Sequence, residues 1–294
     1  MGAVLCLLSA AGFGAMAIFG KLAYEAGVST HALLLVRFAI GAALLVALLA
    51  AVPALRPRRP GRTALLVGLG LGAIGYATQA GLFFAALRRL DASLLALLLY
   101  TYPAWVTLAA FALGREALSR RRLVALGLSS AGLVIVLAGA AGGAFDGVGA
   151  AMGVGAAVAY TTYILVADGP GRALPAPALS TLVCVGAAAT FGVSGAAVGV
   201  DLGFAAEGWL WLGLIAVVST VLPIVAFFAG MARVGPSAAS ILSTFEPVVT
   251  VGLAYLAFGE RLSAAQLGGA ALVLGAAVLL AAPAVRRPPS PPAP

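Results

Sequence analysis

Apolar runs of about 20 residues recur along the whole chain, and each is long enough to cross a bilayer as a helix. The 294 residues are 63% hydrophobic and 9% charged, whereas soluble domains carry about 25% charged residues. A soluble core of this size would need more polar residues for its surface, and a transmembrane β-barrel would show short alternating segments. The sequence therefore predicts an all-α integral membrane protein.

Ten runs qualify as spans, and an even number places both termini on one side of the membrane. They cover residues 3–22, 32–52, 64–86, 92–113, 121–140, 147–167, 177–199, 208–231, 237–258 and 264–283. The segment "PALRPRRPGR" between the second and third runs is punctuated by proline and arginine. The Pro-rich tail, residues 284–294, is expected to be disordered.

The basic residues predict the orientation of the spans. With the N-terminus inside, the cytoplasmic segments hold 12 arginines and the external segments hold 4 basic residues, a bias that the positive-inside rule selects. The cytoplasmic set is Arg56, Arg58, Arg59, Arg62, Arg115, Arg120, Arg121, Arg122, Arg172, Arg233, Arg286 and Arg287; the external set is Lys21, Arg88, Arg89 and Arg261. A net charge of +8 also suits a nucleic-acid partner, but these residues cluster in short loops between spans, as membrane topology requires.

An internal repeat links the two halves of the chain. The 37-residue segments that begin at Phe83 and Phe227 align without gaps at an offset of 144, with 11 identities that include Pro103/Pro247 and Glu116/Glu260. Five spans separate the copies, so the halves must face opposite ways in the membrane. Inverted repeats of this kind are typical of secondary transporters, which bind substrate near the midplane between the halves. The predicted units are residues 1–142 and 143–283, each with five helices, followed by the tail.

Ten spans in two five-helix halves, with a P-x(12)-E element in each half, resemble the EamA-type branch of the drug/metabolite transporter superfamily. Within it the chain looks most like the bacterial amino acid and metabolite exporters, including the aromatic amino acid exporter group. The resemblance implies a basket-like fold around a central cavity, peripheral fifth and tenth helices, and a place in the bacterial inner membrane. It further implies secondary or facilitative export of amino acids or related small metabolites by alternating access.

Polar and aromatic side chains share helix faces in several spans and are unfavourable toward lipid tails, so they are candidates for a cavity lining. The predicted substrate-binding residues are Tyr76, Gln79, Phe83, Tyr100, Tyr102, Trp105, Tyr163, Thr220, Phe227, Ser243 and Glu246. Tyr160, one turn before Tyr163, is their neighbour. The competing interpretation is that these aromatics only pack the bundle, while mid-span Ser and Thr bond their own backbone.

Glu246 lies near the middle of an apolar run, directly before Pro247. A charged side chain at the bilayer centre costs roughly 3 kcal/mol on insertion scales, so it is expected to face the bundle interior or a watery cavity. Arg37 also lies inside its span, and one prediction is structural: an ion pair between the two, or a hydrogen bond of Glu246, that fixes the span beside Pro247. The alternative is a substrate-ammonium contact or a protonatable coupling site, and the residue types leave both open.

The sequence holds no P-loop and no Cys/His set for zinc, so we expect no cofactor, no metal and no catalytic role. The "GLGAIG" run from Gly70 lies inside a span rather than in a βαβ unit, and with pairs such as Gly149 and Gly153 it indicates close helix packing. Lipid and a small molecule are the expected partners, without nucleic acid. Alternatives are a nucleotide-sugar or drug carrier, for which cavity cations are few, and a lipid-modifying membrane enzyme, for which clustered acidic or His residues are missing.

Overall fold

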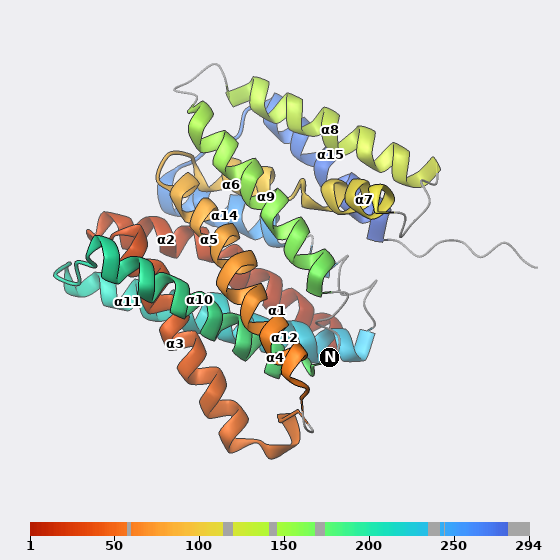
Figure 1. Ribbon diagram of the computed structural model, residues 1–294. Coiled ribbons are helices and arrows are strands. Elements are labelled where there is room, and N and C mark those ends of the chain that lie inside the picture. The colour runs from red at the N-terminus through yellow and green to blue at the C-terminus, as the bar shows by residue number, and fades with distance from the viewer. Residues whose placement is uncertain are drawn as a thin grey trace, which may run out of the picture.

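The computed structural model describes residues 1–57, 60–113, 120–140, 146–167, 174–234, 242–243 and 245–281, and all regular structure within these ranges is helical (Figure 1). The N-terminal half contains α1 (Gly2–Gly14), α2 (Met16–Glu25), α3 (Thr30–Ala51), η1 (Pro53–Leu55), α4 (Arg62–Gly70), η2 (Leu71–Tyr76), α5 (Ala77–Leu87), α6 (Ala92–Leu99), α7 (Tyr102–Ala112) and α8 (Arg120–Ala140). The C-terminal half contains α9 (Gly147–Ala167), α10 (Ala176–Val198), α11 (Ala206–Ala216), η4 (Val217–Val221), α12 (Leu222–Val234), α14 (Glu246–Phe258) and α15 (Ala264–Ala281).

Six helical stretches are long and apolar enough to cross a membrane. They are Gly2–Glu25, Thr30–Ala51, Arg62–Leu87, Gly147–Val166, Pro177–Val198 and Ala206–Phe227. Shorter apolar helices lie at Leu123–Ile135, Glu246–Phe258 and Ala264–Ala276. All nine fall within predicted spans or overlap them. The predicted all-helical membrane fold is therefore confirmed, whereas the predicted number of ten spans stays a prediction. Pro247 and Glu260 of the second proline-glutamate element lie within the described residues. Glu116 of the first element and the predicted tail lie outside them.

The predicted span 92–113 is not one continuous helix. It breaks into α6 and α7 at Tyr100 and Thr101, just before Pro103. Proline has no backbone N–H and disfavours helical geometry in the residue before it, so the ladder of helical hydrogen bonds is interrupted there. In the repeat copy α14 begins at Glu246 with Pro247 in its first turn, where a missing N–H costs nothing. The second part of the predicted span 237–258 is thus the regular helix α14.

Small residues let the helices approach closely. A Cβ added at Gly72 would come within 2.1 Å of the Val183 carbonyl oxygen, and one at Gly186 within 2.3 Å of the Leu69 carbonyl oxygen. Both lie where α10 packs against α4 and η2. Cβ atoms at Gly149 and Gly153 would meet side chains at 2.9 and 3.0 Å, which confirms the predicted close packing there.

The helices pair across the two halves. α8 packs against α15, α3 against α10, α1 against α12, and α5 against α9. The α8–α15 pair lies at one edge of the bundle (Figure 1), as the resemblance implied for the fifth and tenth spans. A core that includes Phe38, Phe83 and Phe84 fills the centre, where α3, α5 and α10 meet. This arrangement brings polar residues of both halves together inside the bundle.

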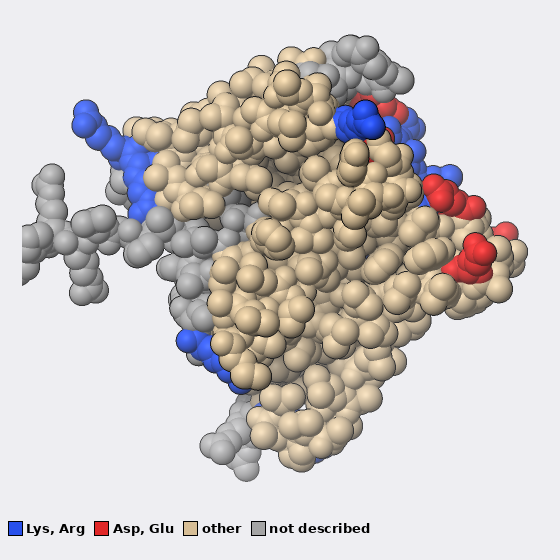
Figure 2. Space-filling view, turned by 180° about the vertical axis from the view of Figure 1, so that it is seen from behind, with Lys and Arg blue, Asp and Glu red and all other residues tan. Residues whose placement is uncertain are grey.

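Charged side chains gather at the ends of the bundle. On the face shown in Figure 2, acidic and basic side chains lie together toward one end, whereas the opposite end shows basic side chains without acidic ones. The surface between them is almost free of charge. Such an uncharged belt between two charged ends is expected of a surface that faces hydrocarbon.

Candidate functional site

A buried carboxylate joins the two halves at one end of the bundle. α14 ends at Gly259, which adopts the left-handed conformation with φ 67°, and the Glu260 N–H then bonds back to the Ala254 carbonyl oxygen. This turn is readily adopted by glycine because it has no Cβ. It brings Glu260 back toward α2 and the first turn of α6, so the "GE" pair that follows an apolar run is the local sequence that places the carboxylate.

Glu260 accepts four hydrogen bonds. Lys21 donates from α2 to Oε1 at 2.7 Å, and the Ala92 N–H donates to the same oxygen at 3.1 Å. Ser93 donates to Oε2 from its N–H at 3.0 Å and from its hydroxyl at 2.9 Å. These residues, Glu260, Lys21, Ala92 and Ser93, are called the Glu260 latch below. A carboxylate at a helix N-terminus satisfies amides that lack helical partners and suits the positive end of the helix dipole.

The surroundings keep Glu260 ionised. Burial, the largest influence, would raise the pKa of its carboxyl, but hydrogen bonds from Lys21, Ser93 and Ala92 outweigh burial and hold the pKa below its ordinary value. Its side chain is 7% exposed and that of Lys21 is 19% exposed. The latch is therefore a largely desolvated ion pair between the two halves, whose carboxylate accepts four hydrogen bonds.

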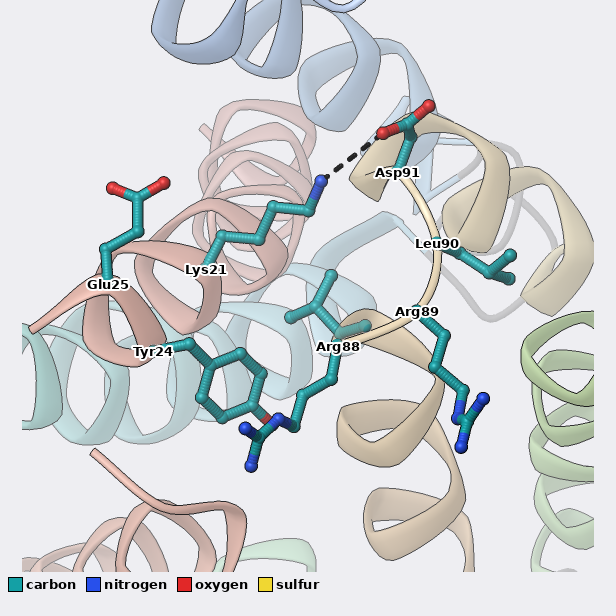
Figure 3. A pocket seen from close by; sticks show the side chains of 8 residues that line it. Lys21, Tyr24, Glu25, Arg88, Arg89, Leu90 and Asp91 are labelled. Carbon is teal, nitrogen blue, oxygen red and sulfur yellow. Dashed lines mark ion pairs between the residues drawn. The ribbon is translucent and has the colours of Figure 1, made fainter. Parts of the chain in front are cut away.

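A pocket of about 460 Å³ adjoins the latch. Its charged lining comes from the end of α2 and from the turn between α5 and α6, and Figure 3 shows Lys21 pointing toward Asp91 across it, at 3.6 Å. Arg88 lies over the Tyr24 ring with 5.3 Å between the guanidinium carbon and the ring centroid. None of the predicted substrate-binding residues lines this pocket, so it is a polar vestibule at the end of the bundle rather than the predicted central cavity.

Five tyrosines form a continuous row in the bundle interior, here called the tyrosine row. Its ring centroids are 5.5 Å apart for Tyr76 and Tyr163, 5.9 Å for Tyr163 and Tyr160, 4.9 Å for Tyr160 and Tyr102, and 5.8 Å for Tyr102 and Tyr100. The rings come from η2, α9, α7 and the break after α6. Four of the five belong to the predicted substrate-binding set, and Tyr160 completes the row between them.

Glu246 stands at one end of the tyrosine row. The Tyr100 hydroxyl lies 2.9 Å from Glu246 Oε2 and 2.8 Å from the Ser243 carbonyl oxygen. A hydroxyl has one proton to donate, so it bonds either the carboxylate or the carbonyl. When it donates to the carbonyl, its oxygen is free to accept a hydrogen bond from a neutral carboxyl. The arrangement therefore accommodates Glu246 in either protonation state.

The predicted ion pair between Arg37 and Glu246 is wrong. No such pair forms among the described residues, and Arg37 and Glu246 each have another partner. Arg37 Nε donates to the Thr220 hydroxyl at 2.9 Å, and Thr220 in turn donates to the Ile215 carbonyl oxygen. Arg37 and Glu246 both lie in the interior, but packing aims them at different neighbours. The Arg37 and Glu246 side chains are thus each available for a role other than an ion pair between them.

The remaining predicted residues occupy three environments. Gln79 and Phe83 are buried on α5, one turn apart and beyond Tyr76. Trp105 is half-buried on α7, and its Nε1 lies 3.3 Å from the Thr101 hydroxyl. Phe227 is half-buried on α12, which packs chiefly against α1, whereas α5, which carries Phe83, packs chiefly against α9.

Two interior features were not predicted from the sequence. Residues 71–76 and 217–221 form π-helical turns within longer helices, and such turns are frequent at functional sites. Ser219, in the second turn, is fully buried, and its hydroxyl has no hydrogen-bond partner. Neither turn contains proline, although Pro223 follows the second turn by two residues. Among the described residues, no group of His, Cys, Asp and Glu is arranged to hold a metal ion.

Comparison with known proteins decides the family. The model of the EamA-like transporter family matches residues 1–138 and 147–282, which together are most of the chain. The chain belongs to the EamA-like transporter family. An "Uncharacterized transporter" of Archaeoglobus fulgidus is 33% identical to this EamA-like protein over 224 residues, covering 76% of the chain and 77% of the relative.

A solved structure shares the fold of this EamA-like transporter. It is titled only "Crystal structure of protein" and superposes with a TM-score of 0.67 at 21% identity, covering 95% of this chain and 96% of the other. The family and the apolar helices together make the chain a multi-pass membrane transporter embedded in a lipid bilayer. Both the family and the name of the relative point to transport and not to catalysis.

Proposed function

We propose that this EamA-like transporter exports amino acids or related small metabolites as a secondary or facilitative carrier. The observation that carries the proposal is the position of Glu246 at the end of the tyrosine row, where it contacts the Tyr100 hydroxyl. A carboxylate attracts a substrate ammonium group, and the faces of tyrosine rings attract cations further. Aromatic walls with a few polar groups are the usual composition of a small-molecule site.

Alternating access between two inverted halves, 1–142 and 143–283, is the proposed mechanism. The separate family matches to residues 1–138 and 147–282 support a repeat. The two π-helical turns support it as well, because Tyr76 at the end of the first and Thr220 in the second are 144 positions apart. The Glu260 latch ties both halves together at one end, so substrate passage there would require it to open.

The proposed setting is the bacterial inner membrane with both termini cytoplasmic. The excess of arginine in the predicted cytoplasmic segments supports this orientation. So does the end of the bundle that shows basic side chains without acidic ones (Figure 2). In this orientation the Glu260 latch closes the external end.

Uptake of tritiated amino acids into everted membrane vesicles tests the proposed function. Vesicles that contain the protein should accumulate at least one amino acid faster than vesicles without it, because eversion turns export into uptake. Nucleotide sugars and cationic drugs belong in the same panel. Uptake of one of these with no amino acid carried would replace amino acid export with the corresponding carrier function.

Substitutions inside the bundle connect transport to the proposed site. Gln79→Ala, Trp105→Ala and Glu246→Gln should each reduce uptake at unchanged protein level. Tyr102→Phe should reduce it more than Tyr255→Phe, a matched control on the half-exposed face of α14, where Tyr255 is 51% exposed. Normal uptake by all of the interior variants would place the substrate elsewhere.

A further inference from the structure

Arg37 is a buried cation whose charge no described side chain neutralises. Its residue is 1% exposed, and no carboxylate within the described residues lies within 4.0 Å of it. Its Nε is bonded to the Thr220 hydroxyl, but its Nη2 is buried without a hydrogen-bond partner. Holding an unpaired charge and an unmade hydrogen bond in a membrane interior is costly, so a structural role alone accounts poorly for this arrangement.

The neighbours of Arg37 form a pocket for a planar cation but supply no anion. The guanidinium carbon lies 4.9 Å from the centroid of the Phe38 ring and 5.5 Å from that of Phe84. These rings fix the orientation of the guanidinium group and exclude water from it. Ser219, next to Thr220 in the chain, contributes a buried hydroxyl that, like Arg37 Nη2, has no hydrogen-bond partner.

Arg37 and Glu246 lie near opposite ends of the tyrosine row. Tyr76 forms the end near Arg37, and Tyr100, which contacts Glu246, forms the other end. The Tyr76 ring centroid lies 5.5 Å from that of Phe38, which in turn packs on Arg37. A positive and a negative group thus flank the tyrosine row without neutralising each other, a pattern that suits a ligand bearing both charges.

We infer that Arg37 binds the carboxylate of the substrate, which makes the transported molecule an amino acid zwitterion rather than a simple amine or cation. Nη2 is the free donor of a guanidinium fork that matches a carboxylate, and Ser219 adds a hydroxyl near the same turn. The ammonium group then lies toward the tyrosine row, whose ring faces attract cations. This inference rests on the proposed function, since it assigns the recognition of the substrate at that site.

Comparison of free amino acids with their amides isolates the carboxylate. The purified full-length protein in detergent is mixed with L-phenylalanine, L-leucine or L-threonine, and separately with the C-terminal amide of each, and binding is measured by thermal stabilisation. At least one amino acid should bind about tenfold or more tightly than its own amide. Arg37→Met should remove that preference by weakening the acid and sparing the amide.

Two further variants separate recognition from structure. Arg37→Lys keeps the charge but loses the fork, so it should retain part of the preference. Arg233→Met removes an exposed arginine of α12 that bonds the Ala229 carbonyl oxygen, and it serves as the control, with the preference for the acid kept. If Arg37→Met fails to give a folded protein, the comparison of acid and amide in the unmodified chain and in Arg37→Lys still decides.

The outcomes distinguish the inference from the proposed function. Equal binding of an amino acid and its amide, or an unchanged preference in Arg37→Met, would overturn the Arg37 assignment and leave amino acid transport standing. Binding of none of the three amino acids, together with no uptake in the vesicle panel, would overturn both.

Discussion

Neutralising Glu260 is expected to destabilise the state in which the latch is closed. Breaking a buried ion pair by removing one partner costs about 3–5 kcal/mol. Gln at this position keeps one acceptor for the amides of α6, and Lys21 keeps Asp91 at 3.6 Å. We therefore expect a loss of about 2–3 kcal/mol for Glu260→Gln. This corresponds to a shift of roughly 30- to 150-fold in the equilibrium between closed and open forms.

Asp91→Asn is the matched control for this prediction, because it removes the other carboxylate near the same lysine. The Asp91 side chain is 72% exposed and has no close contact to Lys21 comparable to that of Glu260. Exposed pairs contribute about 0–1 kcal/mol. Asp91→Asn should thus change the equilibrium by a few-fold at most.

A cysteine at Ala96 reports whether the latch is open. Ala96 is buried on α6, three residues after Ser93 and four before Tyr100, so it shares the helix face that connects the latch to the tyrosine row. In Ala96→Cys, labelling by a membrane-impermeant maleimide should be slow. It should accelerate by at least about tenfold when Glu260→Gln is added, and little when Asp91→Asn is added. Equal labelling rates with and without Glu260→Gln would refute the latch as a gate.

Three further predictions concern the same end of the bundle and its orientation. The pKa of the Glu260 carboxyl is lowered in the folded protein. The contribution of Glu260 to the free energy of unfolding is therefore complete above the ordinary carboxyl pKa of about 4.3 and is lost as pH falls through the pKa of the folded state. The difference in melting temperature between the unmodified chain and Glu260→Gln should be constant from pH 5 to 7 and shrink below pH 4. Gly259→Ala places a Cβ at φ 67°, which costs roughly 1–2 kcal/mol, so it should lower the melting temperature and also speed labelling at Ala96→Cys; unchanged values of both would contradict the role of the turn. A cysteine near Asp146 should react with an impermeant thiol reagent in intact spheroplasts and one near Arg58 only after lysis, and the reverse pattern would invert the proposed topology.

Backbone chemistry explains why the helical membrane fold was predictable from the sequence. A chain with so few polar residues must satisfy its peptide groups internally, and apolar runs of this length do so as helices. The break before Pro103 also follows from the residue itself, since proline cannot donate to the helical ladder. The break at Ala15 and the π-helical turn before Ala77 have no such residue. They depend on how each helix packs against its neighbours, which a single span does not encode.

The interior contacts were predicted only in part, because they too depend on how the helices pack against one another. Burial of Glu246 and Arg37 follows from the cost of charge in hydrocarbon, but the choice of partner depends on which helices meet. Glu246 contacts Tyr100 and Arg37 bonds Thr220, instead of the two charged side chains pairing with each other. Likewise, Glu260 stood out as a scarce residue in the repeat, yet its contacts with Lys21 and Ser93 join segments far apart in the sequence.

Counterflow in proteoliposomes tests the account most directly. Purified protein is reconstituted into liposomes loaded with an unlabelled amino acid, and a trace of the labelled compound is supplied outside, with no ATP and no ion gradient. A carrier that alternates between the two sides should accumulate the label transiently inside, and Glu246→Gln and Arg37→Met should accumulate it more slowly. Absence of accumulation for every amino acid, with correctly inserted and folded protein, would contradict the proposal that this chain carries amino acids.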